Sequence, residues 1–260
     1  MIRTLFIIAG AALVLCIVTV SGGLALGGHE LQRNGWAWTF RDDNGEGVRF
    51  ERVRHAEGED LGPVTTRTLP WTGGEVLQID AGVDVEYRQG DEASVVITGP
   101  KRLADRVRLE DGRLDLTPGD DSVVLSWSHG NISARSERDA LKVIVTAPNV
   151  RRFVANGSGD LDITTYDQPS LSIDISGSAD VTAAGRTDRL ALSIAGSGDA
   201  DARSLTVADA KIDISGSGDA DIAATGQVDV SINGSGDVTL ATRPAKLNSS
   251  VSGSGSVTQD

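Results

Sequence analysis

The sequence predicts an all-β protein, a single-stranded parallel β-helix with ~19-20-residue coils. Two observations lead to this prediction. A tetrapeptide of the form Gly-Ser-Gly-Asp returns six times, and apolar and polar residues alternate on both sides of it. The first glycines of the six copies are 20, 19, 20, 18 and 19 residues apart. A repeat of this length is typical of a solenoid, in which each coil buries its apolar face by stacking on its neighbours.

Each coil consists of two predicted strands that flank the tetrapeptide. Before the tetrapeptide every second residue is apolar, as in Leu171, Ile173 and Ile175, and this period of two predicts a strand with one buried face. Return turns are expected at Asp167-Gln168-Pro169 and Thr242-Arg243-Pro244. Because no helix fits into the return, strands must pair in parallel with their copies in the next coil. The hand preference of parallel crossovers then predicts a right-handed β-helix.

The tetrapeptide is the predicted corner of each coil. Glycine in every first position indicates positive φ or stacking too close for a Cβ atom, whereas the third position tolerates Ala179. Serine fills every second position, and coils ~4.8 Å apart bring hydroxyls near enough for a ladder or for bonds to neighbouring backbone. The predicted structural corner residues are Gly157, Gly177, Gly196, Gly216, Gly234, Gly253, Ser158, Ser178, Ser197, Ser217, Ser235 and Ser254.

The last corner position forms a predicted column of carboxylates on the outer face: Asp160, Asp180, Asp199, Asp219 and Asp237. Ionised neighbours ~4.8 Å apart repel by roughly 0.9 kcal/mol in water, so the stack must offset this repulsion. One interpretation is that the short carboxylates accept hydrogen bonds from corner N–H groups. The alternative is calcium binding, although the spacing does not match the Gly-Gly-x-Gly-x-Asp pattern of calcium β-rolls.

Composition narrows the class of function. The 260 residues carry a net charge of −13 with a pI near 4.6, which disfavours nucleic acid as a partner. The only cysteine is Cys16, so no disulfide forms within the chain. No catalytic triad, metal-ligand spacing or phosphate loop is visible, and no cofactor is predicted. The repeated acids occupy equivalent environments, whereas glycoside hydrolysis needs two carboxylates in unlike ones, so we do not expect an enzyme.

The N-terminal segment, residues 1–28, is expected to be a membrane anchor or a signal peptide. Residues 4–28 carry no charge and are long enough for a hydrophobic helix that crosses a bilayer. The alternative is cleavage after Ala25-Leu26-Gly27, whose small residues fit a signal-peptidase site. In either case Arg3 and the acidic residues that follow the span place the remainder outside the cytoplasm. We expect a cell-envelope protein, anchored in the inner membrane and facing the periplasm, or exported if the leader is cleaved.

Three further segments follow this leader. Residues 29–74 read as a charged linker with an aromatic patch at Trp36, Trp38 and Phe40, which either lies at the membrane interface or forms a short strand covering the first coil. Residues 75–150 are predicted to form an irregular β section. It begins with a worn corner, Ala81-Gly82-Val83-Asp84, which keeps only the final aspartate of the Gly-Ser-Gly-Asp pattern. Residues 151–260 hold the regular repeats. We expect residues 75–260 to form one β domain, which includes strands at Val123 to Trp127 and Leu141 to Thr146.

The worn first coil, the segment that closes in Thr146-Ala147-Pro148-Asn149 and the run of Gly-Ser-Gly-Asp corners together resemble the bacterial putative autotransporter adhesin head GIN domain. The resemblance covers about residue 75 to the C-terminus. It implies a β-helical extracytoplasmic domain with an adhesive role.

The predicted function is a non-catalytic, membrane-tethered cell-envelope module for structure, adhesion or interaction. The alternatives are a polysaccharide-binding or polysaccharide-processing β-helix protein and a weak calcium-binding module. Expected partners are the membrane through residues 4–28, an envelope protein or glycan, and a second copy through end-to-end association at the last coil, where Val257 lies close to an open strand edge.

Overall fold

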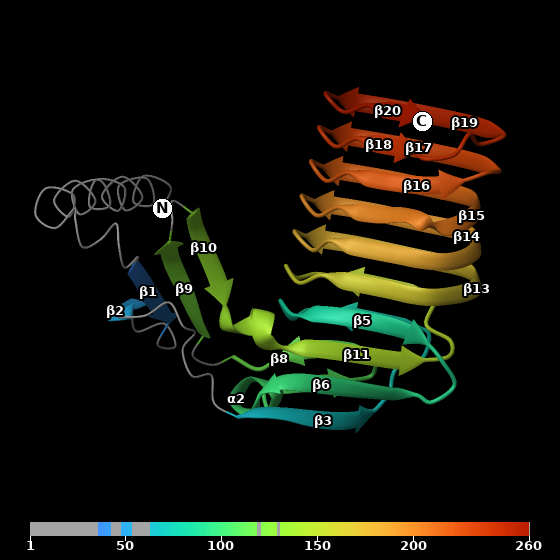
Figure 1. Ribbon diagram of the computed structural model, residues 1–260. Coiled ribbons are helices and arrows are strands. Elements are labelled where there is room, and N and C mark those ends of the chain that lie inside the picture. The colour runs from blue at the N-terminus through green and yellow to red at the C-terminus, as the bar shows by residue number, and fades with distance from the viewer. Residues whose placement is uncertain (1–35, 43–47, 54–62, 119–120, 129–130, 260) are drawn as a thin grey trace, which may run out of the picture. The chain divides into compact units, whose positions relative to one another are not determined.

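The computed structural model describes residues 36–42, 48–53, 63–118, 121–128 and 131–259 (Figure 1). The chain divides into two compact units, Met1–Asp60 with Gly119–Ser136 and Leu61–Pro118 with Glu137–Asp260. The predicted leader, residues 1–28, lies outside the described residues. Within the described part of the chain, no helix combines the length and the apolar character that crossing a membrane requires.

The smaller unit is a four-stranded antiparallel sheet in the order β10, β9, β1, β2. Its strands are β1 (Trp36–Asp42), β2 (Val48–Val53), β9 (Asp121–Ser128) and β10 (Asn131–Ser136). The aromatic patch therefore forms a strand, as one of the two interpretations predicted. Its pairing partners, however, are β2 and β9, and neither belongs to a coil of the solenoid.

Two sequence-based expectations need correction here. Residues 29–74 are not only a linker, because they contribute β1, β2 and also β3 (Val64–Pro70). Residues 121–128 and 131–136 do not continue the solenoid, because β9 pairs with β1 and β10 pairs with β9 in the smaller unit. Alternation identified β9 as a strand and gave a strand as one of two interpretations of β1, but a period of two does not say which sheet a strand joins.

The larger unit is a β-solenoid with coils of about 20 residues, which confirms the predicted architecture (Figure 1). One parallel ladder precedes the corners and stacks the glycines directly, with Gly177, Gly196, Gly216, Gly234 and Gly253 in register. A second parallel ladder follows the corners. The strands that build the two ladders are β4 (Val76–Ile79), β5 (Asp84–Gln89), β12 (Arg152–Ala155), β13 (Leu161–Gly177), β14 (Val181–Gly196), β15 (Ala200–Gly216), β16 (Ala220–Ala224), β17 (Gln227–Gly234), β18 (Val238–Leu240), β19 (Lys246–Gly253) and β20 (Val257–Gln259).

The return of the coil differs from the prediction. In β13, β14 and β15 one strand runs from each corner to the next, so the expected turn at Asp167-Gln168-Pro169 lies inside β13. Asp167 pairs there with Arg186 of the next coil. The chain bends instead at a register shift between Ile163 and Tyr166, where Thr165 has a φ of 55°. The return through Thr242-Arg243-Pro244, in contrast, lies outside any strand.

The end of the solenoid that holds the first coil is covered by antiparallel strands and a short helix. β11 (Lys142–Ala147) pairs in parallel with β5, β6 (Ser94–Pro100) pairs with β11, and β3 pairs with β6. On the other ladder, β8 (Arg113–Leu116) pairs with β4 and β7 (Val107–Glu110) with β8. The helical elements of the described residues are α2 (Lys101–Ala104) and the 3-10 turn η1 (Glu137–Ala140).

The interior of the solenoid is one continuous apolar cluster built from the inward positions of every coil. Its largest members stack in the first coils, where the ring of Phe153 lies between Tyr87 and Tyr166. The two hydroxyls are not left unpaired, since Tyr87 donates to the Ala147 carbonyl (2.7 Å) and Tyr166 to the Ser170 carbonyl (2.6 Å). The core thus begins with aromatic rings and continues with Ile, Leu, Val and Ala.

Candidate functional site

The corner column is the most regular feature of the solenoid surface. Gly216 illustrates why its first position is glycine. The φ angle of Gly216 is 143°, a conformation that other L residues rarely adopt, and an added Cβ would overlap the carbonyl oxygen of Gly196 in the coil below. The third position is equally crowded in the later coils, since a Cβ at Gly218 would overlap the Gly198 carbonyl. The tolerance shown by Ala179 therefore does not extend to every coil.

The corner serines are held by their backbone. The N–H of Ser217 donates to the carbonyl of Gly196 (2.9 Å), and the N–H of Ser235 donates to that of Gly216 (2.8 Å). The side chains point outward and are exposed. None of the six corner hydroxyls bonds to another described residue, so the expected hydroxyl ladder is not formed among them. These serines leave a row of free hydroxyls along one edge of the solenoid.

The corner aspartates form a hydrogen-bonded column that is interrupted between Asp160 and Asp180. The Oδ1 atom of each accepting carboxylate receives a hydrogen bond from the backbone N–H at the same position of the next coil. The N–H of Asp219 donates to Asp199 (2.8 Å), and the N–H of Asp237 donates to Asp219 (2.7 Å). This is the kind of bond that the sequence suggested, but the donor belongs to the neighbouring coil rather than to the carboxylate's own turn. Main-chain N–H groups thus offset part of the repulsion along the column. The other bonds of the series are Asp160 to Asp84, Asp199 to Asp180 and Ser256 to Asp237.

The column has two members that were not among the predicted site residues. Asp84 occupies the corner position of the first coil and lies below Asp160, although 76 residues separate them. The worn corner Ala81-Gly82-Val83-Asp84 was the signal that could have identified it. Ser256 ends the column, where both its N–H and its hydroxyl donate to the carboxylate of Asp237 (2.7 and 2.8 Å).

The calcium interpretation of Asp160, Asp180, Asp199, Asp219 and Asp237 finds no ligand cluster in support. No three carboxylate, imidazole or thiol groups of the described residues come together as a metal site would require. We expect millimolar calcium to leave the thermal midpoint of the protein where a matched ionic strength of sodium chloride leaves it. A calcium-specific rise, abolished by Asp199→Asn together with Asp219→Asn, would contradict this expectation.

Asp160 differs from its neighbours in the column. No described group donates a hydrogen bond to its carboxylate, and the backbone N–H of Asp180 above it makes no bond of the kind seen elsewhere. Burial raises the pKa of the Asp160 carboxyl above its ordinary value, and the charges of Asp84 and Asp180 raise it further. The folded protein therefore holds this proton more tightly than the unfolded chain does, and ionisation of Asp160 lowers stability.

The raised pKa of Asp160 predicts that Asp160→Asn increases the thermal stability of the protein in a pH-dependent way. Below the ordinary value of 3.8 the wild-type carboxyl is protonated in both states, so the variant and the wild type should unfold at similar temperatures. As the pH rises through the raised pKa, the wild type loses stability and the neutral amide does not. We expect the variant to have the higher thermal midpoint at pH 7, by a small margin. Equal midpoints at pH 7 and at pH 2 would contradict the assigned direction.

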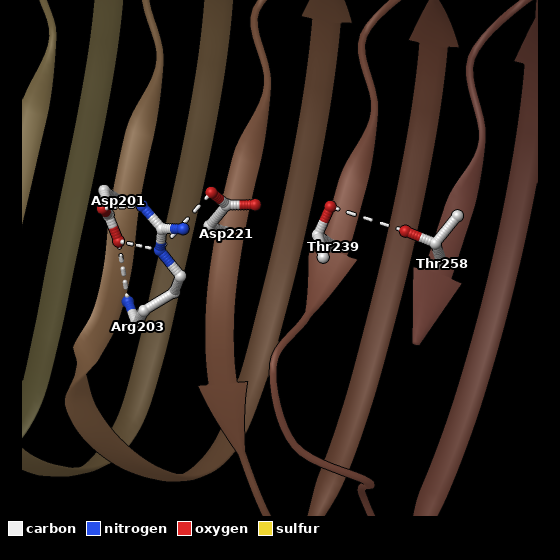
Figure 2. A network of polar contacts seen from close by, with 5 residues as sticks. All are labelled: Asp201, Arg203, Asp221, Thr239 and Thr258. Atoms are coloured by element: carbon white, nitrogen blue, oxygen red, sulfur yellow. Dashed lines mark hydrogen bonds and ion pairs between the residues drawn. The ribbon is translucent and has the colours of Figure 1, made fainter. Parts of the chain in front are cut away.

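The outward face next to the corners carries a second polar row, part of which is shown in Figure 2. The guanidinium of Arg203 donates two hydrogen bonds to Asp201 (3.0 and 2.6 Å) and reaches Asp221 in the next coil at 3.6 Å. The bonds from Arg203 lower the pKa of the Asp201 carboxyl. Further along the row, Thr258 and Thr239 share a hydrogen bond of 3.4 Å. The face is therefore built from polar side chains that bond to one another within a coil and across coils.

An open groove runs along the edge where the return of each coil meets the ladder before the corners. Four of its residues are basic, although the chain as a whole is acidic: Arg151, Arg152, Arg189 and Lys211. Three of these are paired, with Glu75 (3.2 Å), Asp174 (2.8 Å) and Asp213 (2.7 Å) respectively. The guanidinium of Arg189 has no hydrogen-bond or ion-pair partner among the described residues. The groove thus contains one exposed guanidinium, that of Arg189, among basic side chains that are paired with carboxylates.

Comparison with known proteins places this geometry in a family. The family model described as "Putative auto-transporter adhesin, head GIN domain" matches residues 75–244. The chain belongs to the GIN domain family. The GIN domain match begins at the first strand of the solenoid and includes the first-coil corner and five of the six recurring tetrapeptides. The resemblance seen in the sequence is confirmed.

A solved structure shows the same fold. A crystal structure of a putative adhesin from Bacteroides fragilis NCTC 9343 is 18% identical with a TM-score of 0.57, and the match covers 76% of this chain and 97% of that one. A putative lipid binding protein from Parabacteroides distasonis ATCC 8503 is 19% identical with a TM-score of 0.48, and the coverage is again 76% and 97%. No curated protein matches the chain. At 18% identity the Bacteroides fragilis structure shows the fold and nothing finer.

Proposed function

We propose that this GIN domain chain is a non-catalytic, extracytoplasmic module of the cell envelope that acts in adhesion or interaction. The observation that carries the proposal is the outer face described above, together with membership in a family named for adhesins. The carboxylates on that face recur in equivalent environments and bond to their neighbours, as Asp201 does through Arg203. Such a face suits repeated, weak contacts along a rigid rod better than acid-base chemistry at one point.

The location is part of the proposal. The uncharged stretch of residues 4–28 supports a hydrophobic helix that anchors the chain in the inner membrane with the solenoid in the periplasm, or an export signal that is removed. The crossover preference of parallel strands supports a right-handed solenoid. The full chain should fractionate with membranes, resist carbonate extraction and become sensitive to added protease only when the outer envelope is opened. Recovery of a shortened chain starting near Gly28 would favour export.

Binding to envelope components tests the proposed role. The full chain, immobilised in detergent solution, should retain material from solubilised envelope that it does not retain from cytoplasm, and it should release bound glycans chemically unchanged. Retention that is the same for both extracts would contradict an envelope interaction. Shortening of a bound polysaccharide by the wild type would contradict the non-catalytic assignment.

A second candidate function, binding of an acidic polysaccharide, is favoured by the groove that contains Arg189. A guanidinium without a partner among the described residues can pair with a sugar carboxylate, and neighbouring coils repeat along the groove as sugars repeat along a glycan. Binding of a uronic acid polymer should weaken in Arg189→Gln. The matched control is Arg186→Gln on the same strand, since Arg186 is exposed but bonds to Asp167 (2.9 Å) outside the groove. Equal binding by both variants and the wild type would exclude the groove as the site.

A further inference from the structure

The two ends of the solenoid are finished differently. At the end of the first coil, β6 and β3 extend the sheet beyond β11, and α2 adds Leu103 and Ala104 to the core with no exposed surface. At the opposite end, β19 pairs only with β17 and β20 only with β18 among the described strands. The outer edges of β19 and β20 therefore present backbone N–H and C=O groups that no described strand satisfies (Figure 1).

The last coil also leaves part of the apolar interior uncovered. Val251 is 42% exposed, whereas Ile232, at the same position one coil below, is 1% exposed. Leu247 and Val257 are only partly buried against the core. Between Leu247 and Val251 the inward position is a serine, Ser249, where the preceding coil has Val230. The inward row of β19 thus reads Leu, Ser, Val from one end of the strand to the other.

We propose that this end of the solenoid binds a second copy of the chain, head to head, through antiparallel pairing of β19 with β19 of the copy. The pairing would satisfy the free backbone groups of both strands. It would also join the two apolar interiors, because residues directly opposite each other in an antiparallel ladder project from the same face. This interaction goes beyond the proposed envelope role and does not depend on it.

The inward row of β19 is complementary to itself in one register. A two-fold axis at Ser249 places Leu247 opposite Val251 of the second copy, and by symmetry Val251 opposite the copy's Leu247. The two Ser249 side chains then face each other, and their hydroxyls can form a hydrogen bond. The only charged residue of the strand, Lys246, faces Ser252 of the copy, so no like charges meet. Ser249 is the one polar residue in this row, and it occupies the centre of symmetry.

The neighbouring register is poorer. An axis at Ser250 also keeps inward residues together, but it places Val251 opposite Ser249 and Leu247 opposite Gly253, so both apolar pairs are lost. A two-fold interface uses the same surface of both copies, so pairing through β19 closes at two copies and does not continue into a filament.

Cysteine cross-linking tests the register. In a Cys16→Ser background, which leaves no other cysteine, Ser249→Cys should form a disulfide between copies under mild oxidation, since opposite residues of antiparallel strands lie at distances that a disulfide can span. The matched control is Ser252→Cys, which is exposed on the same strand but faces Lys246 of the copy. We expect nearly complete cross-linking at position 249 and only background at position 252. Equal cross-linking at both positions, or more at 252, would overturn the proposal.

Solution mass provides an independent measurement on the full chain. Light scattering, corrected for detergent, should give twice 27.1 kDa for the wild type at the highest concentration and 27.1 kDa for Val251→Asp. Val64→Asp is the control, because Val64 is 72% exposed on β3 near the opposite end of the solenoid. This variant should remain dimeric. A wild type of single mass at all concentrations, or a dimer dissociated by Val64→Asp and not by Val251→Asp, would overturn the proposal.

Discussion

Replacing Gly216 by Val should lower the free energy of unfolding by about 3 kcal/mol or more. Two effects add at this corner. A valine would be strained at a φ of 143°, and its Cβ would overlap the carbonyl oxygen of Gly196. The backbone cannot easily move away, because the Gly216 carbonyl accepts the N–H of Ser235 at 2.8 Å in the next coil. The loss is measured as a lower midpoint in chemical denaturation with an unchanged slope.

The matched control for this substitution is Gly74→Val. An added Cβ at Gly74 meets no atom within 4 Å, and its φ is not in the positive region. This variant should unfold within about 0.5 kcal/mol of the wild type. A wild-type midpoint for Gly216→Val would show that the solenoid can shift a corner without cost, and that the recurring glycine has another cause.

The regular coils could be predicted because their information is local. Within about 20 residues the sequence contains a corner glycine and two alternating segments, and the same pattern in the next coil fixes the register. Gly177 pairs with Gly196 and Leu171 with Leu190, as alignment of the repeats indicates. In a solenoid each coil contacts mainly its neighbours, so a repeated local pattern is almost a complete description of the fold.

The irregular section could not be derived in the same way, because its contacts are distant in sequence. Val85 lies beside Leu161 only because the intervening chain leaves the solenoid and returns through β11. The alternation in β9 is as clear as that in β11, yet β9 joins β1 in another sheet. A period of two reports a buried face, and it carries no information on which strand covers it.

The candidate site, too, could be predicted only in part from the sequence. The carboxylate column followed from spacing, since equal periods place the corner acids one above another. The donors to these acids did not follow, because the direction of each N–H depends on the twist of the corner backbone. Asp160, whose carboxylate lacks such a bond, lies directly below the corner in which Ala179 replaces the third glycine. Sequence marked this corner as different, and the structure shows the difference as a missing hydrogen bond.

Replacing Phe153 by Ala should destabilise the protein by about 3 to 5 kcal/mol. The ring is completely buried between Tyr87 and Tyr166, with ring centroids 4.9 and 6.3 Å away and steep interplanar angles of 72° and 67°. Both tyrosines are fixed by their hydroxyl bonds, so they cannot collapse into the space without breaking them. The variant loses apolar burial, two edge contacts between rings and close packing at the start of the solenoid.

A spectroscopic readout separates this effect from general unfolding. Burial raises the pKa of Tyr87 to about 12, so the folded protein holds that proton more tightly than the unfolded chain and should lose stability as the pH rises from about 10 through 12. A cavity beside the ring admits water, and the pKa of Tyr87 should fall toward 10.0 in Phe153→Ala, seen as tyrosinate absorbance at lower pH. Phe153→Leu, which keeps most of the volume, should lie between the variant and the wild type in both measurements. An Ala variant with wild-type stability and tyrosine titration would show that the aromatic cluster does not anchor the first coils.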